Sequence, residues 1–193
     1  MDFKFLAKSV KNIILKPVKS WEDIYLENKP VKYIGRNLLL PLIILAAVSG
    51  FLGTFLFTRT ELLKAYSVLT GVKYFILIYL VIYVTSLIFR EITKPIGVGT
   101  DFNMSFKLIA YSSVPFIICQ IISLLFESFI FINVLALVGL YIFWTGMEKL
   151  LNPPEKRKLP LMIAATVTFV IVFLTANWFL SIVSDKLYFA FFA

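Results

Sequence analysis

The stretch from Leu108 to Met147 limits what this chain can fold into more than any other part of the sequence. Its 40 residues carry a single charge, Glu127, near the middle. A membrane hydrocarbon core about 30 Å thick is crossed by about 20 helical residues, so the stretch is too long for one span and long enough for two. We predict a helical hairpin, 108–126 and 129–147, with Glu127 and Ser128 at the water boundary.

The composition agrees with a protein whose solvent is lipid. Of the 193 residues, 60% are hydrophobic, whereas ordinary globular domains are about 45–50% apolar. The net charge is +8, but the charged residues lie between apolar runs. This placement points to anionic lipid headgroups and membrane topology, and not to nucleic acid.

The inventory of reactive side chains is small. The chain has no histidine and a single cysteine, Cys119, inside an apolar run. A zinc or haem site of the usual ligand types is therefore not expected, and we predict no cofactor. An intramembrane hydrolase is disfavoured because Ser112, Ser113 and Cys119 have no base or metal to activate them.

Apolar runs of membrane-spanning length recur along the chain. The predicted fold is an all-α membrane protein with a cytoplasmic amphipathic or interfacial segment, 1–37, followed by a five-helix transmembrane bundle, 38–193. The predicted spans are 38–57, 72–89, 108–126, 129–147 and 161–183. We expect the connection 58–71 to be a loop and 184–193 to be a short tail.

The N-terminal segment alternates apolar and basic residues at helical spacing over 1–17, up to Pro17. It predicts an interfacial helix lying on an anionic leaflet. A signal peptide is excluded because charges interrupt any apolar core of the required length. The alternative is a helix whose apolar face packs on the protein's own cytoplasmic loops.

The basic residues divide unequally between the two sides of a five-span topology. Fifteen fall on the side of the N-terminus and four, Arg59, Lys64, Lys73 and Lys186, on the other. The first set is Lys4, Lys8, Lys11, Lys16, Lys19, Lys29, Lys32, Arg36, Arg90, Lys94, Lys107, Lys149, Lys156, Arg157 and Lys158. The positive-inside rule then predicts a cytoplasmic N-terminus and a C-terminus outside.

Two groups of side chains are candidate sites. We expect the first to contact anionic lipid headgroups, and it comprises Lys4, Lys8, Lys11, Lys156, Arg157 and Lys158. The second is a polar face shared by spans two to four, comprising Tyr79, Tyr83, Tyr111, Ser112, Pro115, Gln120 and Asn133. Pro115 predicts a kink, and the buried amide of Gln120 needs a partner, for which Asn133 is a candidate.

Small residues and helix ends give further local predictions. Gly50 and Gly53 in the first span allow a neighbouring helix to approach closely. Asp101 is placed to cap the helix that begins directly after it.

Three sequence elements occur in register with the five spans. The first is Leu15, Lys16, Pro17 and Trp21, ahead of the first span. The second is a loop with Gly97 and Gly99 followed by Phe102 and Phe106, and the third is Ala110, Tyr111 and Pro115, leading to Gly146. In these elements and in span count, the chain resembles the Yip family, five-span membrane proteins named for interaction with Rab-type GTPases.

The resemblance implies a non-enzymatic membrane protein. Eukaryotic members carry a long soluble N-terminal region, whereas this segment has about 37 residues, which favours a prokaryotic-type relative in the cell (inner) membrane. The leading hypothesis is a scaffold or adaptor that organises protein partners or membrane shape at its cytoplasmic face. The alternative is a small transporter, channel or lipid-moving protein using the polar face of spans two to four.

Expected partners follow from these hypotheses. They are membrane lipids, especially anionic ones, and protein partners that the sequence does not identify. A homo-oligomer is compatible with the sequence, and no nucleic acid is expected.

Overall fold

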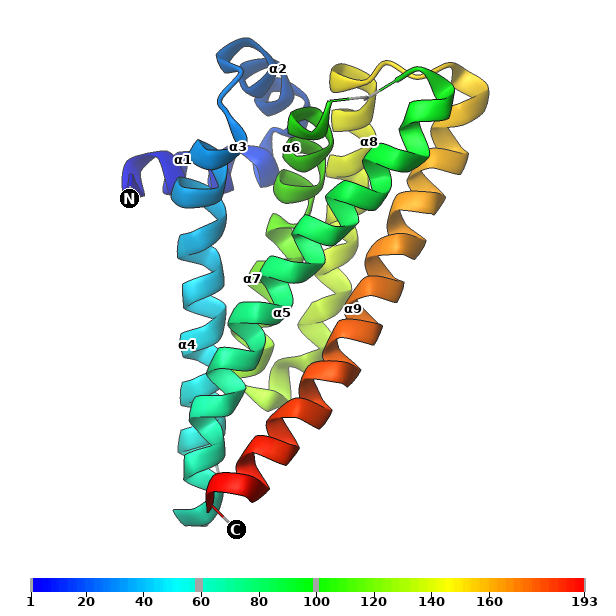
Figure 1. Cartoon of the computed structure of the whole chain (residues 1–193). Helices are drawn as coiled ribbons and strands as arrows, with labels where there is room; N and C mark the ends of the chain where they lie inside the picture. The colour runs from blue at the N-terminus through cyan, green and yellow to red at the C-terminus, as the bar shows by residue number, and fades with distance from the viewer. Residues whose placement is uncertain (1, 58–60, 99–100, 193) are drawn as a thin grey trace.

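Long apolar helices make up most of the structure, a computed structural model that describes residues 2–57, 61–98 and 101–192 (Figure 1). Four segments are long and apolar enough to cross a membrane on their own, namely 31–57, 66–96, 128–150 and 155–190. The helix pair Phe102–Ser112 and Val114–Leu125, bent by 42°, passes the same test when its two helices are taken together, which gives four to five candidate spans. The prediction of an all-α membrane bundle is confirmed.

The N-terminal part is helical almost throughout. Helices α1 (Phe3–Leu15), α2 (Pro17–Glu27) and α3 (Val31–Ile34) precede a π-helical turn, η1 (Gly35–Leu39), and the first spanning helix, α4 (Leu40–Phe57). Pro17 separates α1 from α2 because it lacks a backbone N–H, which the first turn of a helix does not need. Asp2 caps α1 by accepting a 2.9 Å hydrogen bond from the backbone N–H of Phe5.

The third span is broken where the sequence predicts a kink. Helix α5 (Glu61–Thr93) and the 3₁₀ turn η2 (Lys94–Ile96) lead to α6 (Phe102–Ser112) and α7 (Val114–Leu125). Pro115 lies in the first turn of α7 and cannot donate to the carbonyl one turn earlier, so the axis bends at Ser113. Asp101 caps α6 through the backbone N–H of Asn103, as predicted. Gly99 lies outside the described residues.

The fourth span departs from the regular helix that we expected. It begins as an eleven-residue 3₁₀ helix, η3 (Glu127–Leu137), and becomes α-helical only in α8 (Val138–Leu150). Runs of 3₁₀ helix longer than 3–4 residues are uncommon. The chain turns back between α7 and η3, where Phe126 is extended and Phe129 is non-helical. The side chain of Glu127 lies outside the described part of the chain.

Two predicted boundaries are wrong. Helix α5 begins at Glu61, so most of the region expected to be a loop, 58–71, is helical. Helix α9 (Glu155–Phe192) extends far beyond the predicted tail boundary at residue 184. Both helices continue past the hydrocarbon region, where charged and aromatic residues are tolerated, and an apolar run therefore marks only part of each helix.

One continuous core joins the N-terminal helices to the spans. Ile13, Trp21 and Ile34 are fully buried and cluster with span residues such as Ile78 and Ile142. The first span also approaches α7 closely, because a Cβ at Gly53 would collide with the carbonyl of Leu124. The segment 1–37 is thus part of the folded body.

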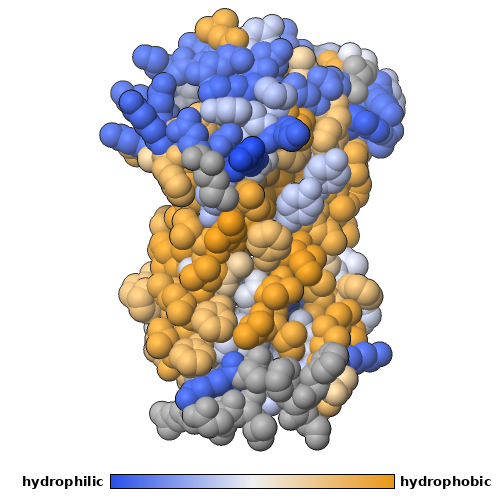
Figure 2. Space-filling view, turned by 60° about the vertical axis from the view of Figure 1, so that its left-hand side comes forward, coloured by the Kyte–Doolittle hydropathy of each residue, from blue (hydrophilic) through white to orange (hydrophobic). Residues whose placement is uncertain are grey.

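The molecule is divided into an apolar belt and a hydrophilic end (Figure 2). The hydrophilic end, which we call the cap, comprises α1, α2, α3 and the connections that precede α6 and α9. The N- and C-terminal ends of the chain lie at opposite ends of the bundle (Figure 1).

Candidate functional site

Trp21 anchors α2 of the cap to the bundle. Its side chain is fully buried, and its indole Nε1 donates a 2.9 Å hydrogen bond to the carbonyl oxygen of Ile142 in α8. A Cβ placed on Gly146 would lie 2.5 Å from Cζ2 of Trp21, so only glycine allows this contact. The ring of Tyr111 packs edge-on against the indole, with 5.8 Å between centroids.

These contacts bring together three residues that lie far apart in the sequence. Trp21 comes from the element ahead of the first span, Tyr111 from the third span and Gly146 from the fourth. The sequence does not show that they meet. Their convergence fixes the position of the cap relative to the membrane-spanning helices.

Two polar contacts add to this anchor. Lys107 of α6 is buried, and its Nζ donates a 2.6 Å hydrogen bond to Oδ1 of Asn28, the left-handed residue that ends α2. Glu22 of α2 pairs with Lys149 of α8 at 2.8 Å. The hydrogen bond and charge of Lys149 lower the pKa of Glu22 below its ordinary value of 4.5.

Helix α1 lies across the end of the bundle (Figure 1). Part of its apolar face, namely Phe5, Leu6, Val10 and Ile14, packs against the core. This is the alternative arrangement left open by the sequence, a helix packed on its own protein. The basic face remains exposed, because Lys4, Lys8 and Lys11 lie on the side away from these contacts.

The six residues predicted to contact lipid headgroups differ in exposure and in ion pairing. Lys4, Lys8, Lys11, Lys156 and Arg157 are exposed and form no ion pair within the described residues. Lys158 differs, because it is buried between Glu148 (3.0 Å) and Glu155 (2.6 Å). Lys158 therefore joins the first turn of α9 to α8, and its charge is already compensated.

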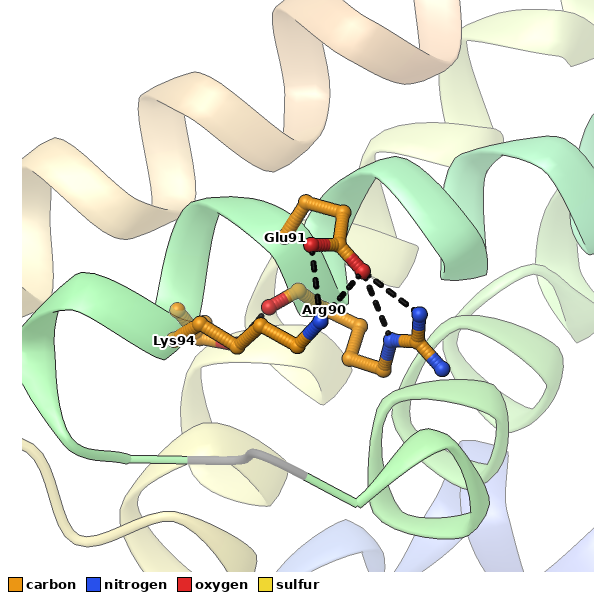
Figure 3. Close-up of polar contacts among 4 residues, drawn as sticks. Arg90, Glu91 and Lys94 are labelled. Carbon is orange, nitrogen blue, oxygen red and sulfur yellow. Dashed lines mark hydrogen bonds and ion pairs between the residues drawn. The ribbon is translucent and has the colours of Figure 1, made fainter.

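Other cations of the cap were not singled out by the sequence. Lys16, Lys19, Lys32 and Arg36 are as exposed as the predicted residues and equally without an ion pair in the described chain. By contrast, Arg90 and Lys94 both donate to the carboxylate of Glu91, so these two cations share one compensating negative charge (Figure 3). The unpaired cations of the cap thus belong mainly to its N-terminal helices and to residues 156–157.

The seven polar residues of spans two to four do not form one face. Tyr79 and Tyr83 stack on each other at 5.9 Å on the exposed surface of α5. Tyr111 is buried beneath α2. The remaining four are Ser112, which lines an apolar cavity, Pro115 at the helix break, and Gln120 and Asn133 farther along the hairpin. Within the described side chains, these seven residues are therefore divided among several separate places.

The predicted pairing of the Gln120 and Asn133 amides, both partly buried, is confirmed. Nε2 of Gln120 donates a 3.3 Å hydrogen bond to Oδ1 of Asn133. Asn133 in turn donates to the carbonyl of Ile130 at 3.0 Å. The pair joins α7 to η3 across the hairpin.

Within residues 2–57, 61–98 and 101–192, no three His, Cys, Asp or Glu side chains cluster as a metal site would require. Cys119 is a free, buried thiol.

Comparison with known proteins gives one finding. Neither the search of curated proteins nor the search of solved structures returns a match. A family model does match, and its description is the Yip1 domain, aligned over residues 11–177. The match begins within α1 and ends in α9, so it takes in Trp21, Tyr111 and Gly146. The chain therefore belongs to the Yip1 domain family.

Proposed function

We propose that this protein is a non-enzymatic membrane adaptor of the Yip type, and that the cap is its binding surface. In this proposal the cap faces the cytoplasm of a prokaryotic cell and holds a protein partner against the anionic surface of the inner membrane. The partner is a protein with an acidic face, because the unpaired charges of the cap are positive.

The anchoring of α2 by Trp21 is the observation that carries this proposal. A basic N-terminal segment tethered only at Asn37 would sample many positions. Here the segment is fixed by a buried indole, a hydrogen bond to Ile142 and the Lys107–Asn28 contact. A surface held in one geometry presents its charges to a partner without the entropic cost of ordering them on binding.

The charge distribution supports the proposed orientation. Fifteen of the described basic residues belong to the end of the bundle that holds the cap, and three, Lys64, Lys73 and Lys186, belong to the opposite end. Exposed lysines and arginines near an anionic surface contribute about 1 kcal/mol each. The five exposed predicted cations therefore suffice to bias the cap toward anionic lipid.

Crosslinking from native membranes tests the adaptor role. A photoreactive residue is placed at Lys19, in the cap, or at Lys186, at the opposite end, and crosslinked proteins are identified. We expect a specific protein partner from the cap position, lost when Lys4, Lys8 and Lys11 are all changed to Glu and retained in the matched Lys186→Glu variant. The same set of proteins from both positions, or no protein from the cap, would contradict the proposal.

Cysteine accessibility tests the orientation. In a Cys119→Ala background, single cysteines are introduced at Lys19 and at Lys186. A reagent that does not cross membranes should label position 186 in intact cells and position 19 only after lysis. Labelling of both positions in intact cells would contradict the proposed topology.

A further inference from the structure

An apolar cavity lies inside the membrane-spanning region, where the break of the third span, the start of α8 and the middle of α9 face one another. Its volume is about 240 Å³. The wall includes Ser112, Phe116, Gly139, Phe143, Thr166 and Phe169. The residues proposed above for headgroup contact take no part in it.

The cavity arises where both helices of the hairpin are irregular. The third span bends by 42° at Ser113, and η3 changes from 3₁₀ to α geometry between Leu137 and Val138. Gly139 holds α8 close to α6, since a Cβ there would lie 2.5 Å from the carbonyl oxygen of Ser112. Helix α9 packs mainly against α5 and much less against α8, which leaves space between α8 and α9.

The mouth of the cavity faces lipid. Two of its lining residues, Leu137 and Val170, are 62% and 47% exposed on the surface of the spans. The molecules available at this surface are therefore the hydrocarbon chains of the bilayer. An apolar cavity of about 150 Å³ stays dry and binds benzene, so the larger space here suits a hydrocarbon better than water.

The hydroxyls around the cavity are not available to a molecule inside it. Those of Ser113 and Thr166 donate to carbonyls of their own helices, at 2.7 Å and 2.8 Å. Oγ of Ser112 is buried, without a hydrogen bond among the described residues and closed off from the cavity. The wall therefore suits a hydrocarbon chain, which needs no hydrogen-bond partner.

We propose that this cavity binds one acyl chain of a membrane phospholipid, inserted between α7, α8 and α9 from the lipid side. Phe116, Phe143 and Phe169 surround the methylene groups of that chain. The site is independent of the adaptor role, because it lies at a different depth and uses none of the cap cations.

A photocrosslinking experiment tests this site. The full-length protein is reconstituted into nanodiscs with a zwitterionic phosphatidylcholine that carries a diazirine on one acyl chain, at increasing probe fraction. The zwitterionic headgroup avoids attraction by the basic cap. We expect a saturable component of labelling that maps to the peptides containing Phe116, Phe143 and Phe169.

A matched pair of variants on one helix separates the cavity from the ordinary lipid-facing surface. Thr166→Leu fills the cavity and should remove the saturable component, whereas Thr175→Leu, at an exposed position of the same helix, should leave it unchanged. Ala136→Leu, which fills the cavity from η3, serves if Thr166→Leu does not fold.

The wild-type protein alone can overturn the proposal. Labelling that rises in proportion to probe fraction without saturation, or that leaves the cavity peptides unmodified, would contradict it. Equal labelling of Thr166→Leu and wild type would do the same. The triple change of Lys4, Lys8 and Lys11 to Glu should not alter cavity labelling, so failure here and failure of the adaptor proposal are distinguishable.

Discussion

The indole nitrogen of Trp21 donates a hydrogen bond to the backbone carbonyl of Ile142, a residue 121 positions later in the chain. The bond joins α2, outside the membrane-spanning bundle, to α8 within it. Gly146 lies one turn farther along α8 and provides the space that the indole fills. Three of the residues by which the chain resembles its family, Trp21, Tyr111 and Gly146, therefore form one docking contact, which positions the cap.

Removing the indole should release α2 from the bundle. We expect Trp21→Ala to destabilise the protein by about 3–5 kcal/mol, the usual cost of truncating a large buried aromatic residue. Trp21→Phe should cost only about 1 kcal/mol, because Ile142 still accepts from Oγ1 of Thr145 at 3.0 Å. Unfolding in mixed micelles with increasing dodecyl sulfate, followed by circular dichroism, measures the stability lost in each variant. Equal losses for the two variants would contradict a packing role for the indole.

Substitution of Gly146 tests the same contact from the other helix. Gly146→Ala places a Cβ 2.5 Å from Cζ2 of Trp21 and 2.7 Å from Cδ1 of Leu108, and such overpacking costs about 1–3 kcal/mol. Gly35→Ala is the matched control, because nothing lies within 4 Å of its Cβ and its backbone is helical. It should be neutral or stabilise by up to about 1 kcal/mol. The free energy of unfolding of the two variants is compared under identical conditions. Equal values would contradict the prediction.

The apolar spans themselves could be predicted, four to five in the structure, because each apolar run has the length that the hydrocarbon core imposes. The helix ends could not, because α5 and α9 continue into regions where charged side chains reach water and the apolar pattern stops. The 3₁₀ geometry of η3 was also beyond prediction, since an unbroken apolar run has no periodicity that separates it from an α-helix.

Side-chain environments were predicted less well than helices. Lys156 and Lys158 are two residues apart and look alike in the sequence, but only Lys158 points to Glu148 and Glu155. The outward position of Tyr79 and Tyr83 depends on which neighbours α5 packs against, and spacing along one helix does not specify them. The convergence of Trp21, Tyr111 and Gly146 is likewise a property of the packed bundle.

Lys156 and Lys158 should respond differently to the same change. Lys158→Met leaves two carboxylates without their shared cation and should lower the melting temperature. Lys156→Met removes an exposed charge with no ion pair in the described chain, so it should leave the melting temperature unchanged and reduce retention of anionic lipid. Differential scanning fluorimetry and native mass spectrometry report the two effects. A lower melting temperature for Lys156→Met, with no change for Lys158→Met, would contradict this assignment.

The Glu22–Lys149 pair should give a small dependence of stability on pH. The pKa of Glu22 is lowered in the folded protein, so its ionised form favours folding above the ordinary value of 4.5. This contribution is lost as the pH falls through the lowered pKa. The melting temperature of wild type should exceed that of Lys149→Met at about pH 6, and the difference should shrink toward about pH 3. A difference that grows on acidification would contradict this assignment.

The Gln120–Asn133 hydrogen bond should contribute modestly to the hairpin. Its 3.3 Å length is beyond the usual range for N–H···O bonds, and such bonds between membrane helices average about 0.6 kcal/mol, with a maximum of about 1.7 kcal/mol. A double-mutant cycle of Gln120→Leu, Asn133→Leu and the double variant should therefore give a coupling near the lower figure. Zero coupling would show that the contact adds nothing.

The same Gln120→Leu variant tests whether Gln120 has a structural role or a role in transport. In liposomes it should show the same ion flux and lipid scrambling as wild type, because its amide is used to join two helices and not to line a path.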